Sequence, residues 1–376
     1  MNKHYISKYK YSIAIVLILI MIASVSPTVY AEDNGIDLEN AKRTKNYVYE
    51  IIDGRAFVCD YIGTGNNIRI PSKFEGKPVV YINIHYKKIA KIDVSKCKQL
   101  EWLAVTNSRI SSINLKENKK LEYLYLTGNK IKKIDLNKNK KLKDVDISNN
   151  KLTSINITGG KQINTLRVDD NQLPSLNLKK NPKLAYLMAS SNKIIKMDLR
   201  KNSKLELVDL AKNKLKRLNV KNNKKLESLD LSGNKLKSLN LSNNKKLTYL
   251  YLYNNKFEKI NLSKSTALRD IDLRKNKLKK INIKNLRFLS SLDCGQNKLT
   301  DLDLSQNNRL EELYCDNNKL KYLDISGVPE MYSIDFSENK GLSIYLNNNY
   351  MYSITYSPVN GTICLENPDP GVYQNK

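Results

Sequence analysis

A 21-residue repeat dominates this sequence and restricts what the chain can fold into. Residues 225–245 read KLESLDLSGNKLKSLNLSNNK, and residues 246–266 read KLTYLYLYNNKFEKINLSKST. The frame recurs thirteen times without insertion, starting at residues 78, 99, 120, 141, 162, 183, 204, 225, 246, 267, 288, 309 and 330. Self-similarity at a short fixed period indicates an architecture in which neighbouring units stack on one another.

Six positions of each frame (2, 5, 7, 12, 15 and 17) are almost always aliphatic. In the frame from residue 225 they are Leu226, Leu229, Leu231, Leu236, Leu239 and Leu241. This spacing is neither the helical period of 3.6 nor a single alternating strand. Its first half predicts a short strand whose side chains at positions 4, 6 and 8 point outward. Because one repeat cannot bury its leucines alone, the frames are expected to share one continuous core.

Position 10 is asparagine in eleven of the thirteen frames, from Asn129 to Asn339. A buried asparagine at that point can bond backbone groups where the strand turns away, in its own repeat and in the adjoining one. We therefore expect this column to replace the backbone hydrogen bonds that an irregular loop leaves unmade.

The pattern L-x-x-L-x-L-x-x-N-x-L resembles that of leucine-rich repeats, and the 21-residue form is similar to the internalin-like secreted and surface proteins of Gram-positive bacteria. Cys294 and Cys315 occupy position 7 of consecutive frames and resemble the cysteine ladder of one internalin subgroup. Buried free thiols that pack as small apolar groups are the favoured interpretation of this pair. The resemblance implies a leucine-rich-repeat solenoid of the α/β horseshoe class, mostly parallel β, with an irregular or 3-10 convex side, about thirteen repeats and β caps.

The N-terminus has the pattern of a secretory signal peptide. Basic residues precede the apolar run Ile13–Ala23, and small residues up to Ala31 predict cleavage before Glu32, so residues 1–31 are expected to be removed. The apolar run is shorter than the about 20 residues that span a bilayer, so no membrane span is expected after cleavage. An uncleaved anchor is the alternative.

Residues 32–77 are expected to form an N-terminal β cap over the open end of the solenoid. The Asp53-Gly54 turn between Tyr47–Ile52 and Arg55–Tyr61 predicts a hairpin. This stretch resembles the N-terminal part of bacterial surface-antigen-type leucine-rich repeats.

The solenoid itself is assigned to residues 78–350, and residues 351–376 are assigned to a C-terminal cap and tail. Asn360-Gly361 lies between Ser353–Tyr356 and Thr362–Leu365 and suggests a closing hairpin.

The chain is strongly basic, with 65 Lys+Arg against 37 Asp+Glu and a net charge of +28. Loss of residues 1–31 removes three lysines and leaves +25. Position 11 is basic in twelve of the thirteen frames, with Gln172 as the exception: Lys88, Arg109, Lys130, Lys151, Lys193, Lys214, Lys235, Lys256, Lys277, Lys298, Lys319 and Lys340. Such a balance favours an anionic partner. Nucleic acid is not expected, because the chain looks exported, has an acidic strand face and lacks a recognisable nucleic-acid module.

The outward strand positions 4, 6 and 8 have the opposite sign. Their 39 sites hold eleven acids, only two basic residues and nine aromatic residues. Exposed aromatic clusters are typical of interface centres. The candidate ligand-binding residues on this concave face are Tyr81, Trp102, Tyr123, Tyr125, Tyr186, Asp209, Asp230, Tyr249, Tyr251, Tyr253, Asp272, Asp293 and Tyr314. The anchors that we favour are Trp102, Tyr123, Tyr125, Tyr249, Tyr251 and Tyr253.

These features predict a secreted or cell-surface binding and adhesion module that holds an extracellular protein, such as a host protein, on its acidic and aromatic concave face. A glycan-binding module and a structural protein held on anionic wall polymer by its lysine-rich edges are the alternatives. We assign no catalytic residue, cofactor or metal site. Only His85 remains as a histidine after processing, and solvated aspartates are the favoured interpretation of the Asp columns.

Overall fold

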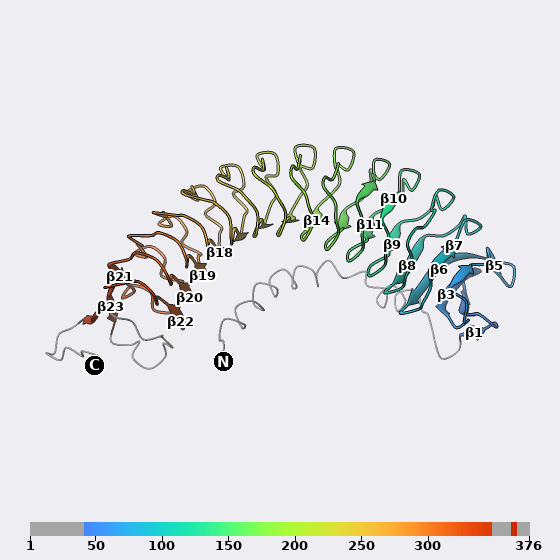
Figure 1. The fold of residues 1–376 in the computed structure, drawn as a ribbon, viewed down its shortest axis with the longest axis horizontal. Helices are drawn as coiled ribbons and strands as arrows, with labels where there is room; N and C mark the ends of the chain where they lie inside the picture. The colour runs from blue at the N-terminus through green and yellow to red at the C-terminus, as the bar shows by residue number, and fades with distance from the viewer. Residues whose placement is uncertain (1–40, 348–361, 367–376) are drawn as a thin grey trace.

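The computed structural model of the protein describes residues 41–347 and 362–366. These residues form a solenoid of about 14 turns that bends into an arch, with one row of strands along its inner side (Figure 1). The row belongs to a 17-stranded sheet in which successive turns pair in parallel. The leucine-rich-repeat solenoid predicted from the repeat is thereby confirmed.

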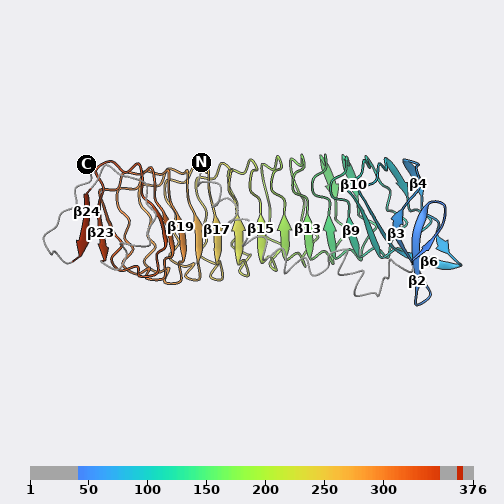
Figure 2. The same cartoon turned by 90° about the horizontal axis from the view of Figure 1, so that it is seen from below.

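Each of the thirteen frames contributes one inner strand, and Figure 2 shows these strands side by side. From β9 onward every inner strand is three residues long. In chain order they are β6 (Lys77–His85), β8 (Trp102–Thr106), β9 (Tyr123–Tyr125), β11 (Asp144–Asp146), β13 (Thr165–Arg167), β14 (Tyr186–Met188), β15 (Leu207–Asp209), β16 (Ser228–Asp230), β17 (Tyr249–Tyr251), β18 (Asp270–Asp272), β19 (Ser291–Asp293), β20 (Glu312–Tyr314) and β22 (Ser333–Asp335).

The 21-residue period sets the register of this sheet. Leu229 of β16 lies opposite Leu250 of β17, and both side chains are fully buried. Because side chains alternate along a strand, the central residue points into the core while the residues on either side of it point outward. Burial of a leucine stabilises a fold by about 1.5–3 kcal/mol, and the repeats line up such residues in one continuous core.

The outer, convex side contains short strands and no 3-10 helix in the described ranges 41–347 and 362–366. Positions 15 and 17 of each frame both reach the core two residues apart, which is the spacing of extended chain. The parallel pairs there are β4 (Asn67–Arg69) with β7 (Lys91–Asp93), β10 (Lys133–Asp135) with β12 (Ser154–Asn156), and β21 (Tyr322–Asp324) with β23 (Ser343–Asn347). The convex side is therefore irregular and extended, and the 3-10 alternative is wrong for these residues.

The asparagine column at position 10 has the contacts that the sequence predicted, and Asn234 is representative. Its Nδ2 donates to the carbonyl oxygens of Leu210 and Leu231, both at 2.9 Å. Its Oδ1 accepts a hydrogen bond from the backbone N–H of Leu215 at 2.9 Å. One side chain thus serves backbone groups of its own repeat and of the preceding repeat.

A second asparagine column, at position 20, was not predicted. In Asn223, Nδ2 donates to the carbonyl oxygens of Leu199 at 3.1 Å and of Asn202 at 2.8 Å, both in the preceding repeat. The members of this column are all fully buried: Asn118, Asn139, Asn181, Asn202, Asn223, Asn244 and Asn307. Where a frame carries both asparagines, as the frame with Asn213 and Asn223 does, they bind the two ends of that turn to the turn before it.

Position 9 has a left-handed backbone in all thirteen frames, with φ between 49° and 70°. Only Gly128 and Gly233 place glycine there, although a left-handed conformation costs other residues about 1–2 kcal/mol. The chain turns away from the inner strand at this point in every frame, so the left-handed geometry is retained whatever the residue.

Lys212→Gly is therefore expected to raise the free energy of unfolding by about 0.5–1 kcal/mol. Relief of the left-handed backbone outweighs the additional entropy of a glycine in the unfolded chain, about 0.5–1 kcal/mol. Gly233→Ala, at the same position of the next frame with φ +66°, is the matched reverse change and should lower stability by about 1 kcal/mol. Urea unfolding of both variants tests this, and shifts of the same sign would contradict it.

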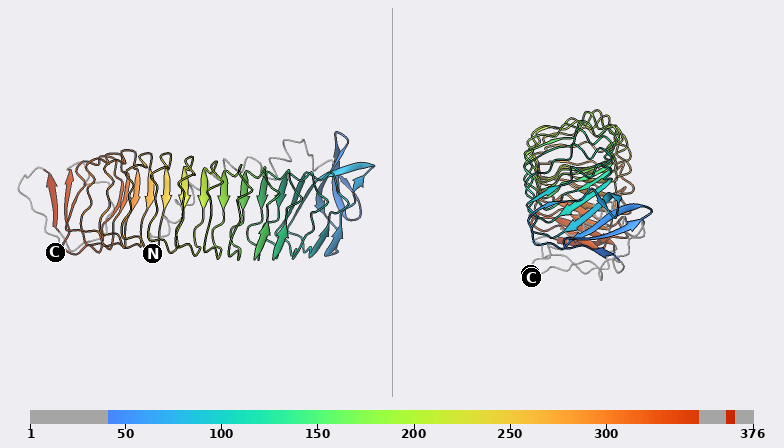
Figure 3. Two further views of the ribbon diagram at one scale, coloured as in Figure 1. Left: turned by 90° about the horizontal axis from the view of Figure 1, so that it is seen from above. Right: turned by 90° about the vertical axis from the view of Figure 1, so that its right-hand side faces the viewer.

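The N-terminal hairpin predicted around Asp53-Gly54 is present. β2 (Tyr47–Ile52) pairs antiparallel with β3 (Arg55–Tyr61), and β1 (Lys42–Arg43) pairs antiparallel with β2. β3 in turn runs parallel to β6, so the hairpin extends the inner sheet by one turn. In the end-on view of Figure 3 these N-terminal strands project to one side of the stacked turns.

The remaining strands are β5 (Lys73–Phe74), antiparallel to β6, and β24 (Thr362–Glu366), parallel to β23 on the convex side. The other arm of the predicted closing hairpin, residues 353–356, lies outside the described residues. The predicted signal peptide, residues 1–31, also lies outside them.

Cys294 and Cys315 lie in successive turns with fully buried side chains, and both are free thiols. Burial raises the pKa of both thiols above its ordinary value. They pack as small apolar groups in the leucine core, as the sequence favoured.

Candidate binding face

The concave face consists of the outward side chains at positions 4, 6 and 8, from β6 to β22, and it lies on the inside of the arch in Figure 1. Adjacent strands lie about 4.8 Å apart, so thirteen strands give a face roughly 58 Å long. Residues at one position of successive frames are direct partners across the sheet, as Asp209 and Asp230 are. Side chains of one kind therefore form columns along the solenoid.

Five aromatic side chains form one cluster at the N-terminal end of this face: Phe57, Tyr81, Trp102, Tyr123 and Tyr125. The Trp102 ring centroid lies 5.7 Å from that of Tyr81, 5.0 Å from that of Tyr123 and 4.9 Å from that of Tyr125. Phe57, from the hairpin strand β3, extends the cluster at 5.6 Å from Tyr81.

The cluster differs from the exposed platform that was expected. Tyr81, Trp102 and Tyr125 are only 1%, 0% and 7% exposed, whereas Tyr123 is half-buried. Rings on strands about 4.8 Å apart cover one another's faces, and stacked or tilted pairs at these separations are favourable. The expected exposure of these three residues is therefore wrong, although their placement on the concave side of the sheet is as predicted.

The second aromatic group lies on β17 and the residues that follow it, and consists of Tyr249, Tyr251 and Tyr253. Its three rings are not all exposed to solvent. Tyr251 is 2% exposed, and its hydroxyl donates to Oδ2 of Asp270 at 3.1 Å. Tyr249 and Tyr253 are half-buried, and the Arg274 guanidinium lies 4.7 Å from the Tyr253 ring centroid. Tyr249 and Tyr253 are thus the members of the trio that solvent reaches.

The two isolated tyrosines of the predicted site are both half-buried and hydrogen-bonded. The Tyr186 hydroxyl donates to Oε2 of Glu206 at 2.9 Å, and the Tyr314 hydroxyl lies 2.9 Å from Oγ of Ser333. Each bond reaches the next repeat along the chain, so these tyrosines also stabilise the stacking of turns.

Four predicted aspartates lie in two cross-strand pairs, Asp209 with Asp230 and Asp272 with Asp293. In each of them Oδ1 accepts a hydrogen bond from the backbone N–H two residues later, at 2.8–3.1 Å. Asp272 and Asp293 are only 5% and 2% exposed, whereas Asp209 and Asp230 are half-buried. This bond explains the recurrence of aspartate at position 6, because it ends each strand with an Asx turn.

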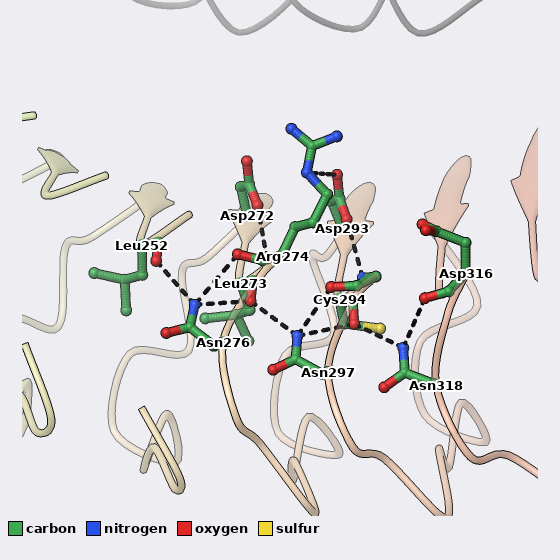
Figure 4. A network of polar contacts seen from close by, with 11 residues as sticks. Leu252, Asp272, Leu273, Arg274, Asn276, Asp293, Cys294, Asn297, Asp316 and Asn318 are labelled. Carbon is green, nitrogen blue, oxygen red and sulfur yellow. Dashed lines mark hydrogen bonds and ion pairs between the residues drawn. The ribbon is translucent and has the colours of Figure 1, made fainter. Parts of the chain in front are cut away.

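Figure 4 shows Arg274 between the second pair of aspartates, with the position-10 asparagines below them. Arg274 Nε lies 3.5 Å from Oδ2 of Asp293. Burial, together with the neighbouring Asp293 carboxyl, raises the pKa of Asp272 well above its usual range, and burial and Asp230 do the same for the pKa of Asp209. Two ionised carboxylates in one pair repel each other, and a cation beside the pair would stabilise both.

Burial also raises the pKa of other concave carboxyls, to about 6 for Asp144 and Asp169 and to about 7 for Asp270. Desolvation is the largest cause in all three, and for Asp144 the nearby Arg167 guanidinium, at 2.9 Å, lowers the pKa and so opposes it. The concave face consequently carries less negative charge at neutral pH than its eleven acids suggest.

Three charged groups on the face were not among the predicted site residues. Asp270 accepts the Tyr251 hydroxyl, and Arg274 packs on Tyr253. Glu312 accepts the Tyr332 hydroxyl through Oε1 at 2.7 Å. All three occupy outward positions of the frame, so the repeat pattern correctly places them on the concave face. Their contacts depend on which residues stand on the neighbouring strands, and the repeat pattern does not determine those residues.

Within residues 41–347 and 362–366, no group of three or more His, Cys, Asp and Glu side chains is placed to hold a metal ion. No helix in that part of the chain has the length and apolar character to cross a membrane. His85 lies with its Nδ1 2.6 Å from Oγ1 of Thr106, and burial lowers its pKa.

Comparison with known proteins agrees with this architecture. A family model described as "Leucine Rich repeat" matches residues 222–238. Among curated proteins, no sequence matches the chain significantly.

Among solved structures, the functional domain of InlJ from Listeria monocytogenes is 25% identical, with 77% of this chain and 69% of that chain covered and a TM-score of 0.66. A leucine-rich-repeat protein of Leptospira interrogans is 22% identical, with 75% and 79% covered and a TM-score of 0.67. The ectodomain of a membrane receptor kinase of Arabidopsis thaliana, in complex with Casparian strip integrity factor 2, is 22% identical, with 80% and 44% covered and a TM-score of 0.61. The last two likenesses concern the fold alone. The chain is a leucine-rich-repeat solenoid with structural similarity to bacterial internalins.

Proposed function

We propose that this protein is a secreted, non-enzymatic binding module whose concave face engages an extracellular protein. The observation that carries the proposal is the composition of that face. Between β9 and β20, a distance of roughly 43 Å, half-buried tyrosines flank the paired, partly desolvated aspartates, and this length suits a folded protein better than a small molecule.

The contact residues of the proposal are those that combine partial exposure with fixed geometry: Tyr123, Tyr249, Tyr253, Asp209 and Asp230. Tyrosines contribute large contact area at low entropic cost, and half-buried carboxylates attract lysine and arginine strongly. In this proposal the partner presents basic side chains, while the buried Trp102, Tyr125 and Tyr251 serve to hold the exposed rings in position.

Structural relatives support a binding role for such a face. The Arabidopsis ectodomain was solved in complex with Casparian strip integrity factor 2, and another similar structure is that of a Toll–Spatzle complex, at a TM-score of 0.51. Secretion is part of the proposal because of the N-terminal basic and apolar segment, and detection of the processed chain in culture medium would support it.

The double substitution Tyr249→Ala, Tyr253→Ala is expected to weaken partner binding at least tenfold, because interface aromatics commonly contribute about 2 kcal/mol or more. The partner is first captured from host and bacterial surface proteins with the purified protein and then titrated against each variant. Tyr322→Ala, on the convex strand β21 and 46% exposed, is the matched control and should keep affinity within twofold. Equal affinities for all three proteins would exclude this region of the concave face, and capture of a glycan alone would favour the glycan-binding alternative.

A further inference from the structure

The basic side chains at position 11, from Lys88 to Lys340, form a single file along one lateral edge of the solenoid, here called the basic row. Each lies two residues after the left-handed turn that ends an inner strand. All twelve are exposed. Among the described residues none of them forms an ion pair, although nine ion pairs occur elsewhere in the same part of the chain.

The backbone under the basic row is held in place by two sets of hydrogen bonds. From Arg109 to Lys319, each position-11 N–H donates to the position-12 carbonyl of the preceding repeat, at 2.8–3.0 Å; Lys235 to Leu215, at 2.8 Å, is typical. From Lys130 onward, the residue just before each of them, the asparagine at position 10, is held by side-chain hydrogen bonds to the backbone, as described for Asn234. The lysine Cα atoms are therefore fixed at the spacing of the turns, about 4.8 Å, and only the side chains are free to adjust.

The opposite edge of the solenoid does not offer an equivalent array. Position 1 is basic in seven of the thirteen frames, and the other six frames have Pro78, Gln99, Gln162, Ala267, Phe288 and Glu330. The acidic concave face separates the two edges. The basic row is thus the longest regular series of like charges on the molecule, interrupted only at Gln172, where Lys193 Nζ donates to Gln172 Oε1 at 3.3 Å.

Two cations about 5 Å apart repel each other by roughly 0.8 kcal/mol in bulk water, and anchored Cα atoms limit how far the lysine side chains can spread, so the row gains from neutralisation along its whole length. A linear polyanion neutralises the row at low entropic cost, because each bound unit holds the next unit near its lysine. Binding also releases counterions from both partners. The lysine ammonium group is a compact charge on a flexible side chain, so it can adjust its position to each phosphate. The single file offers space for one chain, and the acidic face beside it repels a second strand.

We infer that the basic row binds one extended polyphosphodiester chain, of the poly(glycerol phosphate) type, laid along the edge of the solenoid. This site is independent of the concave face and of the protein ligand proposed there. The Tyr249→Ala, Tyr253→Ala variant should therefore bind the polymer normally, which makes failure of one proposal distinguishable from failure of the other.

The test measures binding of labelled poly(glycerol phosphate) of 16 units to the purified protein by fluorescence anisotropy over a range of salt concentrations. A row variant carries Lys214→Gln, Lys235→Gln, Lys256→Gln, Lys277→Gln, Lys298→Gln and Lys319→Gln. Its affinity should fall at least thirtyfold at 0.1 M salt, and the slope of log affinity against log salt should decrease by about 4, since each phosphate contact contributes about 0.7.

The matched control removes the same charge from the opposite edge, through Lys120→Gln, Lys141→Gln, Lys183→Gln, Lys204→Gln, Lys225→Gln and Lys246→Gln. Its affinity should fall less than fivefold. Gln172→Lys closes the one gap in the row and should tighten binding two- to threefold. Equal losses in the row and control variants, or no gain from Gln172→Lys, would overturn the assignment to this edge. Tighter binding of a single-stranded oligonucleotide with the same number of phosphates would overturn the assigned ligand class.

Discussion

Asn234→Ala is expected to lower the free energy of unfolding by about 3 kcal/mol, the largest effect of any single polar substitution proposed for this protein. The side chain is 7% exposed and bonds the carbonyl oxygens of Leu210 and Leu231 and the N–H of Leu215. Alanine leaves these backbone groups buried without a partner, and each such loss costs about 1–3 kcal/mol. Relaxation of the loop and entry of water recover part of that cost.

Asn240→Ala is the matched control for this prediction, because it changes the same residue type in the same repeat. Asn240 is exposed and its Oδ1 accepts one hydrogen bond, from the N–H of Ser242 at 3.0 Å. Its loss should cost less than about 1 kcal/mol. Chemical unfolding followed by circular dichroism compares the variants; similar midpoints for Asn234→Ala and Asn240→Ala would show that the column does not stabilise the solenoid as argued.

Mildly acidic solution is expected to stabilise this protein through Asp270, whose folded-state pKa of about 7 lies above its ordinary value of 3.8. A group with a raised folded pKa binds its proton more tightly when folded, so stability increases as pH falls from about 7 towards about 4. Asp270→Asn mimics the protonated form and should raise the free energy of unfolding at pH 7.5 by about 2 kcal/mol. That is half of the roughly 4 kcal/mol that three pKa units represent, because the side chain is partly exposed.

Thermal unfolding of the protein and of Asp270→Asn at pH 5, 6 and 7.5 measures this effect. The melting temperatures should differ most at pH 7.5, and the difference should shrink steadily at pH 6 and pH 5. Asp303→Asn gives the opposite sign, because Lys284 at 2.8 Å lowers the pKa of Asp303 to about 2, so its stabilisation is present at pH 7.5 and is lost as pH falls below about 4. A constant difference between protein and Asp270→Asn at all three pH values would contradict a raised pKa.

The repeat pattern predicted the architecture because it specifies every contact that recurs. Leu229 pairs with Leu250 because both occupy position 5, and Asn234 bonds two repeats because position 10 lies at the same bend in each. The short strands on the convex side could not be predicted from the repeat pattern in the same way. The spacing of positions 15 and 17 fits an extended chain, but an irregular chain with the same spacing also brings both side chains into the core.

The concave face was predicted less completely than the fold, for a physical reason. Alternation determines which way Trp102 and Tyr251 point, but their exposure depends on which side chains stand on the neighbouring strands. Trp102 is covered because aromatic rings flank it on both sides, and Tyr251 is held down by Asp270 on the next strand. Position 20 carried a visible column of asparagines, and a tally of that position across the frames would have revealed it.

The uniform register of the inner strands makes the length of this molecule adjustable in whole units. Because a residue at one position pairs with its counterpart 21 residues later, removal of one complete frame brings together two surfaces that already match. Duplication or loss of a frame thus lengthens or shortens the arch by about 4.8 Å without redesign of its interior. The number of frames therefore sets the length of the concave face, while the outward side chains of each frame can change independently.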